Sequence, residues 1–391
     1  MLGGSGIWSV RLRPVAVGIV NGGCDERFGM VRQAMASTLE SGADVGCSVA
    51  VVHDGELVVD LWGGYIDEAR SVVWDRDTLT CVFSTTKAMT ALCMLILADR
   101  GDVDLHAPVA RYWPEFAAGG KEGVELRHIL SHTAGLPTWS EPVTVADLCD
   151  WEKVTSLLAA ATLWWEPGTA LGYHALTHGY LVGEVVRRIT GRSIGQFVAE
   201  EVAGPLGVDF HIGTPPSVDP RIAPAIHPAT TEDPLDPGSL AYRVATNPRL
   251  SPQDLAGEAV RRAEIPAGNG YGNARSVAMA QSAVSCGTRD LLSEAGRAAI
   301  FEVQAEGTDL VMGVPLRMGI GYGLNSELLT VSPNERACFW AGSGGSLVVN
   351  DLDAHMTIAY VMNRMVDDAS GPYERGASMV MAAYASLADA S

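Results

Sequence analysis

Ser84 and Lys87 stand three residues apart at the start of an apolar stretch that runs from residue 84 to residue 99. If this stretch is a helix, positions i and i+3 share a face, and the lysine ammonium lies within reach of the serine hydroxyl. Burial and the positive end of the helix dipole would lower the pKa of the lysine and let it act as a base near neutral pH. Because a hydroxyl at its ordinary pKa is a poor nucleophile, this pair indicates an activated serine.

The same four residues have a plainer interpretation. A Ser-x-x-Lys spacing arises often by chance, and a serine before a helix usually serves as its N-cap. The surroundings of Lys87 favour chemistry, since lysine is rarely buried without a specific role and the helix that follows is apolar nearly all round.

Tyr173 is the second candidate. It follows the turn at Pro167-Gly168 and precedes a predicted helix, so its phenol would lie near a helix N-terminus that favours the anionic form. A phenol with a pKa of about 10 becomes a general base only beside a cation, which Lys87 would supply. The alternative is a core or rim tyrosine with a satisfied hydroxyl.

A glycine-rich segment is the third candidate, with the sequence Trp340-Ala341-Gly342-Ser343-Gly344-Gly345-Ser346. Glycine on an edge strand would let a substrate approach the backbone closely. The N–H of Ser343 would then pair with the N–H of Ser84 as an oxyanion hole. A glycine-rich hairpin turn is the alternative.

Hydrophobic periodicity predicts the elements that position these residues. Asp54-Gly55 between two β-rich runs predicts a hairpin, because glycine tolerates the positive φ of a tight turn. Strands are predicted at 48–53, 56–62, 337–341, 346–350 and 355–362, and helices at 24–41, 84–99, 147–161, 175–190, 193–203, 273–286 and 371–387.

Strands at both ends of the chain, with helices between them, predict an α/β fold of the α+β type. We expect residues 1–23 to form a loosely held lead segment, and residues 24–80 with 261–391 to form an α/β domain. Residues 81–260 should form a mostly helical domain, with an irregular excursion at 207–252, where proline density excludes long helices and central strands. The site is expected where the two domains meet.

Composition narrows the classes of function. The net charge of −19 argues against binding to nucleic acid and to anionic membranes. No apolar stretch approaches the length of a membrane span, and arginines interrupt the N-terminal segment before a secretory signal develops. Seven cysteines at scattered spacing without a CxxC pattern predict reduced thiols and a cytoplasmic protein.

Two histidine pairs have the i, i+4 spacing of a helical zinc site, namely His128 with His132 and His174 with His178. No HExxH pattern accompanies them, so we expect no metal, and His132 is predicted to fix the backbone around Gly135. We also expect no cofactor. Ser285 lies in an approximate G-x-S-x-G pattern, but it ends a predicted helix instead of forming an elbow after a strand.

In this order and spacing, the segments resemble the serine β-lactamase and penicillin-binding protein superfamily. They look most like its class C β-lactamase-like branch, the family VIII carboxylesterases. The resemblance covers roughly residues 25–390, with support from the segments 126–137, 164–168 and 361–365. It implies a mainly antiparallel sheet flanked by helices, with a mostly helical middle domain.

By this resemblance, Ser84 is the nucleophile, Lys87 the motif lysine and Tyr173 the tyrosine of the Y-x-N element. Trp340-Ala341-Gly342 stands in place of the K-T-G or H-x-G element, and Ser343 would give the second oxyanion N–H. Ala175 replaces the Y-x-N asparagine, and Trp340 replaces the lysine that would recognise a carboxylate.

Both departures favour neutral esters. The resemblance therefore implies a serine carboxylesterase for short-chain acyl or aryl esters that works through an acyl-enzyme, with weak β-lactam hydrolysis as a side activity. The alternatives are a β-lactamase, D-amino-acid peptidase or acyltransferase of the same superfamily, and a non-catalytic binding protein. Whether Lys87 or Tyr173 is the resting base stays open, because the two titrations are coupled. The expected partner is a small-molecule ester, and the sequence is silent on oligomeric state.

Overall fold

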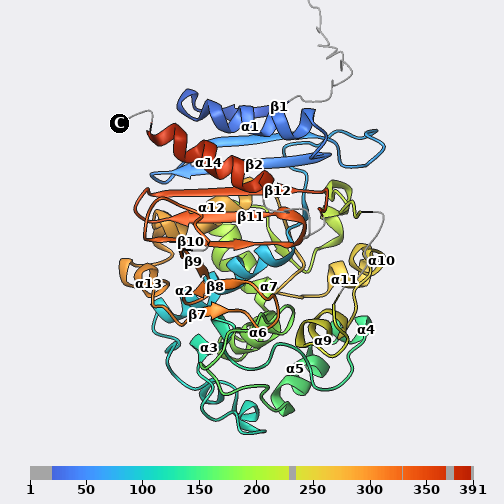
Figure 1. Ribbon diagram of the computed structural model, residues 1–391, viewed down its shortest axis with the longest axis vertical. Helices are drawn as coiled ribbons and strands as arrows, with labels where there is room; N and C mark the ends of the chain where they lie inside the picture. Colours follow the sequence, from blue (N-terminus) through green and yellow to red (C-terminus); the bar gives the residue numbers. More distant parts are fainter. Residues whose placement is uncertain (1–19, 229–234, 328, 367–373, 389–391) are drawn as a thin grey trace, which may run out of the picture.

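The computed structural model describes residues 20–228, 235–327, 329–366 and 374–388. Within these ranges its main element is a nine-stranded antiparallel sheet in the order β1-β3-β2-β12-β11-β10-β9-β8-β7 (Figure 1). The strands are β1 Val20–Cys24, β2 Gly46–His53, β3 Glu56–Gly64, β7 Ala305–Thr308, β8 Pro315–Met318, β9 Gly323–Leu324, β10 Ala337–Ala341, β11 Leu347–Asp351 and β12 Met356–Met362.

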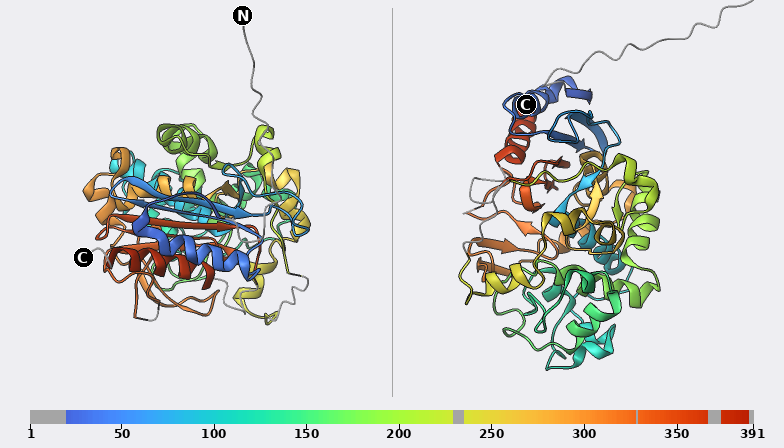
Figure 2. Two further views of the ribbon diagram at one scale, coloured as in Figure 1. Left: turned by 90° about the horizontal axis from the view of Figure 1, so that it is seen from above. Right: turned by 90° about the vertical axis from the view of Figure 1, so that its right-hand side faces the viewer.

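The central pairing of the sheet joins the two ends of the chain. Strand β2 runs antiparallel to β12, with register partners from Cys47 opposite Met362 to His53 opposite Met356. Both strands are mostly apolar and buried almost throughout, because helices cover both of their faces. Helices α1 (Gly29–Glu40) and α14 (Glu374–Ala388) lie side by side on one face (Figure 2), and α12 (Ala274–Ser285) packs on the other.

The region between the outer strands is mostly helical. Its centre is α2 (Thr86–Asp99), which is buried from Thr86 to Leu97 because α6 (Thr177–Thr190), α12 and β10 all contact it. The other helices are α3 Leu126–Leu130, α4 Val145–Leu148, α5 Trp151–Ala160, α7 Ile194–Phe197 with the π-turn Val198–Ala203, α8 Gly204–Leu206, α9 Leu240–Thr246, α10 Pro252–Ala256, α11 Glu258–Arg262 and α13 Glu294–Ala299. A small sheet pairs β4 (Thr80–Cys81) and β5 (His211–Ile212) with β6 (Gly270–Gly272).

The predicted α+β arrangement is confirmed, and so is the first hairpin, whose turn residues Asp54 and Gly55 have φ of 51° and 81°. The structure begins the sheet earlier than the sequence indicates, because β1 starts at Val20, inside the expected lead segment. The domain boundaries stay a prediction.

The sequence did not indicate the short strands β4 to β9, which lack a clear apolar alternation. In its described part, the proline-rich excursion contains the two-residue strand β5, the 3₁₀ helix Pro216–Arg221 and α9 before residue 252. Its residues 229–234 lie outside the described ranges. The last predicted helix begins at Glu374, and residues 371–373 of that prediction also lie outside them.

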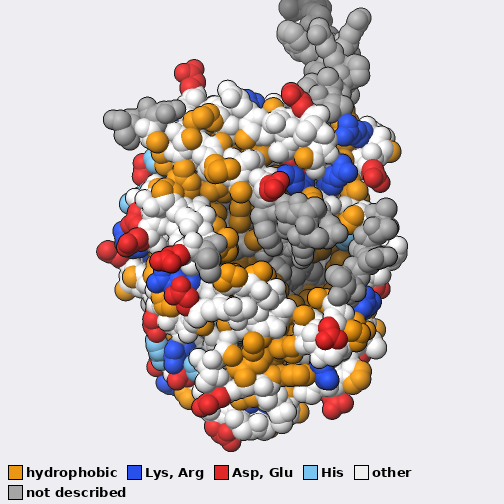
Figure 3. Space-filling model, viewed as in Figure 1, with side chains coloured by type: hydrophobic (Ala, Val, Ile, Leu, Met, Phe, Trp, Pro, Cys, Tyr) orange, Lys and Arg blue, Asp and Glu red, His pale blue; other side chains and the backbone are white. Residues whose placement is uncertain are grey.

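No helix in the described ranges combines the length and the apolar character needed to cross a bilayer. On the face shown in Figure 3, acidic and basic side chains are interspersed, with apolar side chains gathered between them.

Candidate active site

Ser84 is presented by a sharp change from strand to helix. Strand β4 ends at Cys81, and Phe83 has a φ of 47°, a left-handed conformation that bulky residues rarely adopt. A 3₁₀ turn over Phe83–Thr85 then leads into α2. Ser84 is partly exposed although its neighbours on both sides are buried, so the turn lifts the hydroxyl out of the core.

Lys87 lies one helical turn further on and is fully buried. Its Nζ is 3.2 Å from Ser84 Oγ and 2.8 Å from the hydroxyl of Tyr173. It also donates to the backbone carbonyls of Ala175 and Ala267, each at 2.8 Å. Burial holds the pKa of Lys87 well below its ordinary value, which favours the neutral amine.

The two carbonyls orient the N–H groups and the lone pair of the Lys87 amine. A carbonyl only accepts hydrogen bonds, so Ala175 and Ala267 occupy two of the N–H groups of Lys87. In the neutral amine no further N–H remains, and the lone pair is left for the two hydroxyls of Ser84 and Tyr173. The geometry therefore suits Lys87 to accept a proton from either hydroxyl.

Tyr173 completes this group. Its hydroxyl is 2.6 Å from Ser84 Oγ, and Lys87 Nζ lies 4.7 Å from the centroid of its ring. The structure thus brings together the three residues that the sequence singles out, through mutual hydrogen bonds. The backbone N–H of Tyr173 donates to the buried carboxylate of Asp309 at 3.1 Å, which fixes the loop that carries the phenol.

The glycine-rich segment forms a closed turn against the nucleophile. Gly342 N donates to Ser346 O at 2.8 Å, and Ser346 Oγ donates to Val82 O at 2.8 Å. A Cβ on Gly342 would collide with Val82 O and lie 3.2 Å from Ser84 N. The turn that carries Ser84 thus comes so close to residue 342 that only glycine fits there. The next residue, Ser343, is exposed.

Trp340 is buried next to Tyr173, with 6.4 Å between the ring centroids. Its ring stacks on His132 at 5.4 Å with an interplanar angle of 21°. Trp340 stands where the K-T-G element has its lysine. The site therefore has an aromatic ring at this position instead of a positive charge.

His132 plays a different role from the predicted one. Its Nδ1 accepts a hydrogen bond from the backbone N–H of His174, next to Tyr173, while His174 Nε2 accepts from Leu136 N beside Gly135. The prediction that His132 itself fixes the Gly135 turn was therefore wrong. Burial lowers the pKa of His174 to about 4 and the pKa of His132 well below its ordinary range, so both rings are neutral at neutral pH.

Sequence reasoning missed three contributors: the carbonyls of Ala175 and Ala267 and the carboxylate of Asp309. Backbone carbonyls leave no trace in side-chain identity, and Asp309 lies far from Tyr173 in the sequence. Gly268 and Asn269 follow Ala267 and lead into β6. Among the described residues, no three His, Cys, Asp or Glu side chains are grouped so that they would hold a metal.

The family model described as Beta-lactamase matches residues 31–379. The chain is 36% identical over 367 residues to the esterase/β-lactamase LipL of Mycobacterium tuberculosis, covering 89% of this chain and 83% of that protein.

Two solved structures extend the comparison. A family VIII carboxylesterase superposes with a TM-score of 0.87 and 39% identity, covering 94% of this chain and all of the other. A penicillin-binding protein homologue from Caulobacter crescentus superposes with a TM-score of 0.85 and 34% identity, again over 94% of this chain and all of the other. The fold implied by the resemblance is confirmed. This chain belongs to the Beta-lactamase family of serine hydrolases.

Proposed function

We propose that this protein is a serine carboxylesterase that hydrolyses short-chain acyl or aryl esters through an acyl-enzyme on Ser84. The observation that carries the proposal is the buried Lys87, whose two carbonyl contacts leave its lone pair for the hydroxyls of Ser84 and Tyr173. Relatives whose names describe them as esterases support the same reaction.

In the first half-reaction, Ser84 Oγ attacks the ester carbonyl while its proton passes to the pair Lys87 and Tyr173. The N–H groups of Ser84 and Ser343 stabilise the oxyanion. Collapse of the tetrahedral intermediate breaks the bond to the alcohol, which leaves with the proton from the pair. Water then attacks the acyl-enzyme by the same route and releases the carboxylic acid.

Neutral esters are favoured over β-lactams by the residues around the nucleophile. Trp340 offers an apolar ring where a cation would bind the carboxylate of a β-lactam or a peptide. Ala175 offers only its carbonyl, which Lys87 already occupies. β-Lactam hydrolysis is therefore proposed as a weak side activity, consistent with the double name of the relative LipL.

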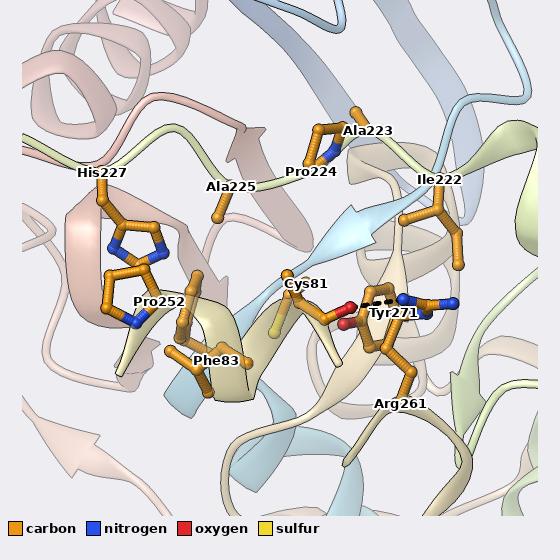
Figure 4. Close-up of a pocket in the computed structure, with 12 residues that line it drawn as sticks. Cys81, Phe83, Ile222, Ala223, Pro224, Ala225, His227, Pro252, Arg261 and Tyr271 are labelled. Atoms are coloured by element: carbon orange, nitrogen blue, oxygen red, sulfur yellow. Dashed lines mark hydrogen bonds between the residues drawn. The ribbon is translucent and has the colours of Figure 1, made fainter. Parts of the chain in front are cut away.

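An apolar pocket next to the nucleophile turn is proposed to hold the acyl chain. It has a volume of about 70 Å³. The segment from Ile222 to His227 forms one wall, and Cys81, Phe83 and Tyr271 lie opposite it (Figure 4). Arg261 closes one side with its guanidinium bonded to Ala256 O at 2.5 Å. The pocket adjoins the nucleophile turn at Phe83, the residue before Ser84, and its small volume is the basis on which we propose a preference for short acyl groups.

The test of the reaction is turnover of p-nitrophenyl acetate, butyrate and octanoate beside nitrocefin, with Ser84→Ala as the control. We expect ester turnover to exceed nitrocefin turnover, and the variant to lose at least about a thousandfold in kcat while staying folded. Wild-type-like turnover by Ser84→Ala would refute the mechanism. Faster nitrocefin than ester turnover would assign the protein to the β-lactamases. Failure to label with a fluorophosphonate would favour a non-catalytic binding protein.

The acyl pocket has its own test. Ala225 lines it, so Ala225→Phe should fill it and lower kcat/KM for octanoate and butyrate more than for acetate. Ala36→Leu, on α1 across the sheet, is the matched control and should leave the ratio unchanged. An unchanged chain-length profile in Ala225→Phe would remove the pocket from the proposal.

We also propose a cytoplasmic location. All seven cysteines fall within the described residues and are unpaired, and four of them are buried. Free thiols in this number are typical of a reducing compartment.

A further inference from the structure

The turn that carries Ser343 is held from behind by one arginine. Arg375, at the start of α14, is only 7% exposed, although arginine is rarely buried without a partner. Its guanidinium reaches four acceptors: Nη2 donates to Gly344 O at 2.6 Å and to Arg364 O at 3.0 Å, and Nη1 donates to Asp44 Oδ1 at 2.5 Å and to Ala43 O at 3.3 Å.

A buried carboxylate balances this charge. Asp44 is 1% exposed and also accepts a hydrogen bond from Tyr360 OH on β12 at 2.7 Å. It precedes β2, so the ion pair ties the N-terminal part of the sheet to α14. The planar fork of arginine can hold Asp44 on one side and Gly344 on the other, which the compact ammonium of a lysine cannot do.

The opposite side of the turn is anchored to the nucleophile. Ser346 Oγ donates to Val82 O and lies 2.9 Å from Thr85 Oγ1, so it bonds to residues on both sides of Ser84. Ser343 lies inside this turn, which the bond from Gly342 N to Ser346 O closes, and it directly precedes Gly344. Gly344 and Gly345 have φ of 80° and 119°, conformations that only glycine adopts readily, and such a backbone needs external contacts to keep one geometry.

We propose that Arg375 is a positioning residue for the oxyanion hole, an inference that rests on the proposed esterase function and on the role of Ser343 in it. By holding the Gly344 carbonyl, Arg375 keeps the Ser343 N–H directed at the position where negative charge develops. Pre-oriented donors stabilise an oxyanion because they need not reorganise during the reaction. Arg375 touches no substrate and acts through the turn alone.

A purely structural Arg375 would behave differently. If Arg375 only held α14 in place, its loss would lower the free energy of unfolding, and the turnover of the folded fraction would stay unchanged. Loss of oxyanion alignment would lower kcat while KM, which reports neutral ground-state binding when acylation is slow, changes little. Affinity for an inhibitor that forms a charged tetrahedral adduct on serine, such as an alkyl trifluoromethyl ketone, would fall with kcat.

Arg375→Lys is the test, because lysine keeps a cation beside Asp44 and loses the second arm toward Gly344. Tyr384→Phe is the matched control, since Tyr384 lies on the same helix and binds Asp351 at 2.6 Å without touching the turn. We expect Arg375→Lys to lower kcat for p-nitrophenyl butyrate by about tenfold to a hundredfold. KM should change less than twofold, and trifluoromethyl ketone affinity should fall by the same factor as kcat. In Tyr384→Phe, kcat, KM and trifluoromethyl ketone affinity should all stay at their wild-type values.

Wild-type kcat in a folded Arg375→Lys, or equal losses in Tyr384→Phe, would overturn the inference. Asp44→Asn keeps the acceptor and weakens the pair, so it should show the same signature at smaller size. If neither variant folds, the pair serves stability alone and the inference fails. An inactive wild type would instead refute the esterase function, which Ser84→Ala tests separately.

Discussion

Lys87 is the residue around which the proposed chemistry is organised. A fully buried lysine costs the folded protein free energy as long as it carries a charge, because desolvation is not offset by a counter-ion: its described partners are two hydroxyls and two carbonyls. The neutral form is less costly and is the form that accepts a proton. Burial therefore favours the proton-accepting form of Lys87 and at the same time lowers the stability of the folded protein.

This cost has a measurable pH dependence. Burial lowers the pKa of Lys87 in the folded state, while the unfolded chain keeps the ordinary value of 10.5. Between these two values the unfolded state binds more protons, so stability rises with pH, by up to about 1.4 kcal/mol per pH unit for one group. We expect the urea unfolding free energy of the wild type, minus that of Lys87→Met, to rise from pH 8 to pH 9.5. A flat difference would mean that Lys87 keeps an ordinary pKa when folded.

The side chains of the proposed site were accessible from the sequence, whereas their supports were not. Residue type and spacing in the sequence indicated Ser84, Lys87 and Tyr173. The apolar context of α2 indicated that Lys87 is buried. The carbonyls of Ala175 and Ala267 belong to backbone whose path depends on tertiary contacts. His132 was misplaced for the same reason, since its partner His174 lies on another segment.

At the level of elements, the hairpin of β7 and β8 reaches across to the loop of Tyr173. Asp309, at the start of its turn, accepts hydrogen bonds from Val311 N and Met312 N at 2.8 Å and from Tyr173 N at 3.1 Å. One carboxylate thus shapes the turn and holds the phenol's backbone. The short strands of this hairpin gave no clear sequence signal, so this link was not predictable.

Asp309→Ala would leave these three N–H groups without their acceptor. We expect a loss of about 1–3 kcal/mol of unfolding free energy and about a tenfold lower kcat/KM, because Tyr173 loses its fixed position. Asp309→Asn keeps an acceptor oxygen and should recover most of the activity. Urea unfolding and ester kinetics on both variants measure this. Destabilisation of the alanine variant with wild-type kinetics would limit Asp309 to shaping the hairpin.

At the level of the whole molecule, the sheet unites chain ends that local patterns do not connect. Apolar runs indicated β2, β3, β10, β11 and β12, but periodicity does not say which strand pairs with which. The strands at both chain ends were expected to share one unit, but the pairing of β2 with β12 was not predicted. The edge strand β1 was missed because Gly22 and Gly23 weaken its strand character.

Because the site draws on the helical region and on the sheet, activity should end with global unfolding. Ile358 on β12 is buried against α1 and α14, away from the nucleophile. Ile358→Ala should cost about 2–5 kcal/mol. In this variant, far-UV circular dichroism and esterase activity should be lost at the same, lower urea concentration. Loss of activity well before the loss of helix signal would mean that the site unfolds independently.

The pairing of β2 with β12 also has a consequence for biosynthesis. A ribosome releases β2 well before β12, so for roughly tens of seconds the nascent chain carries a strand that is almost fully buried in the fold without its neighbour. During that interval an unpaired edge is open to wrong partners, including other nascent copies. We therefore expect the yield of native protein in a cell-free translation to depend on chaperones that shield β2 until the last strand emerges.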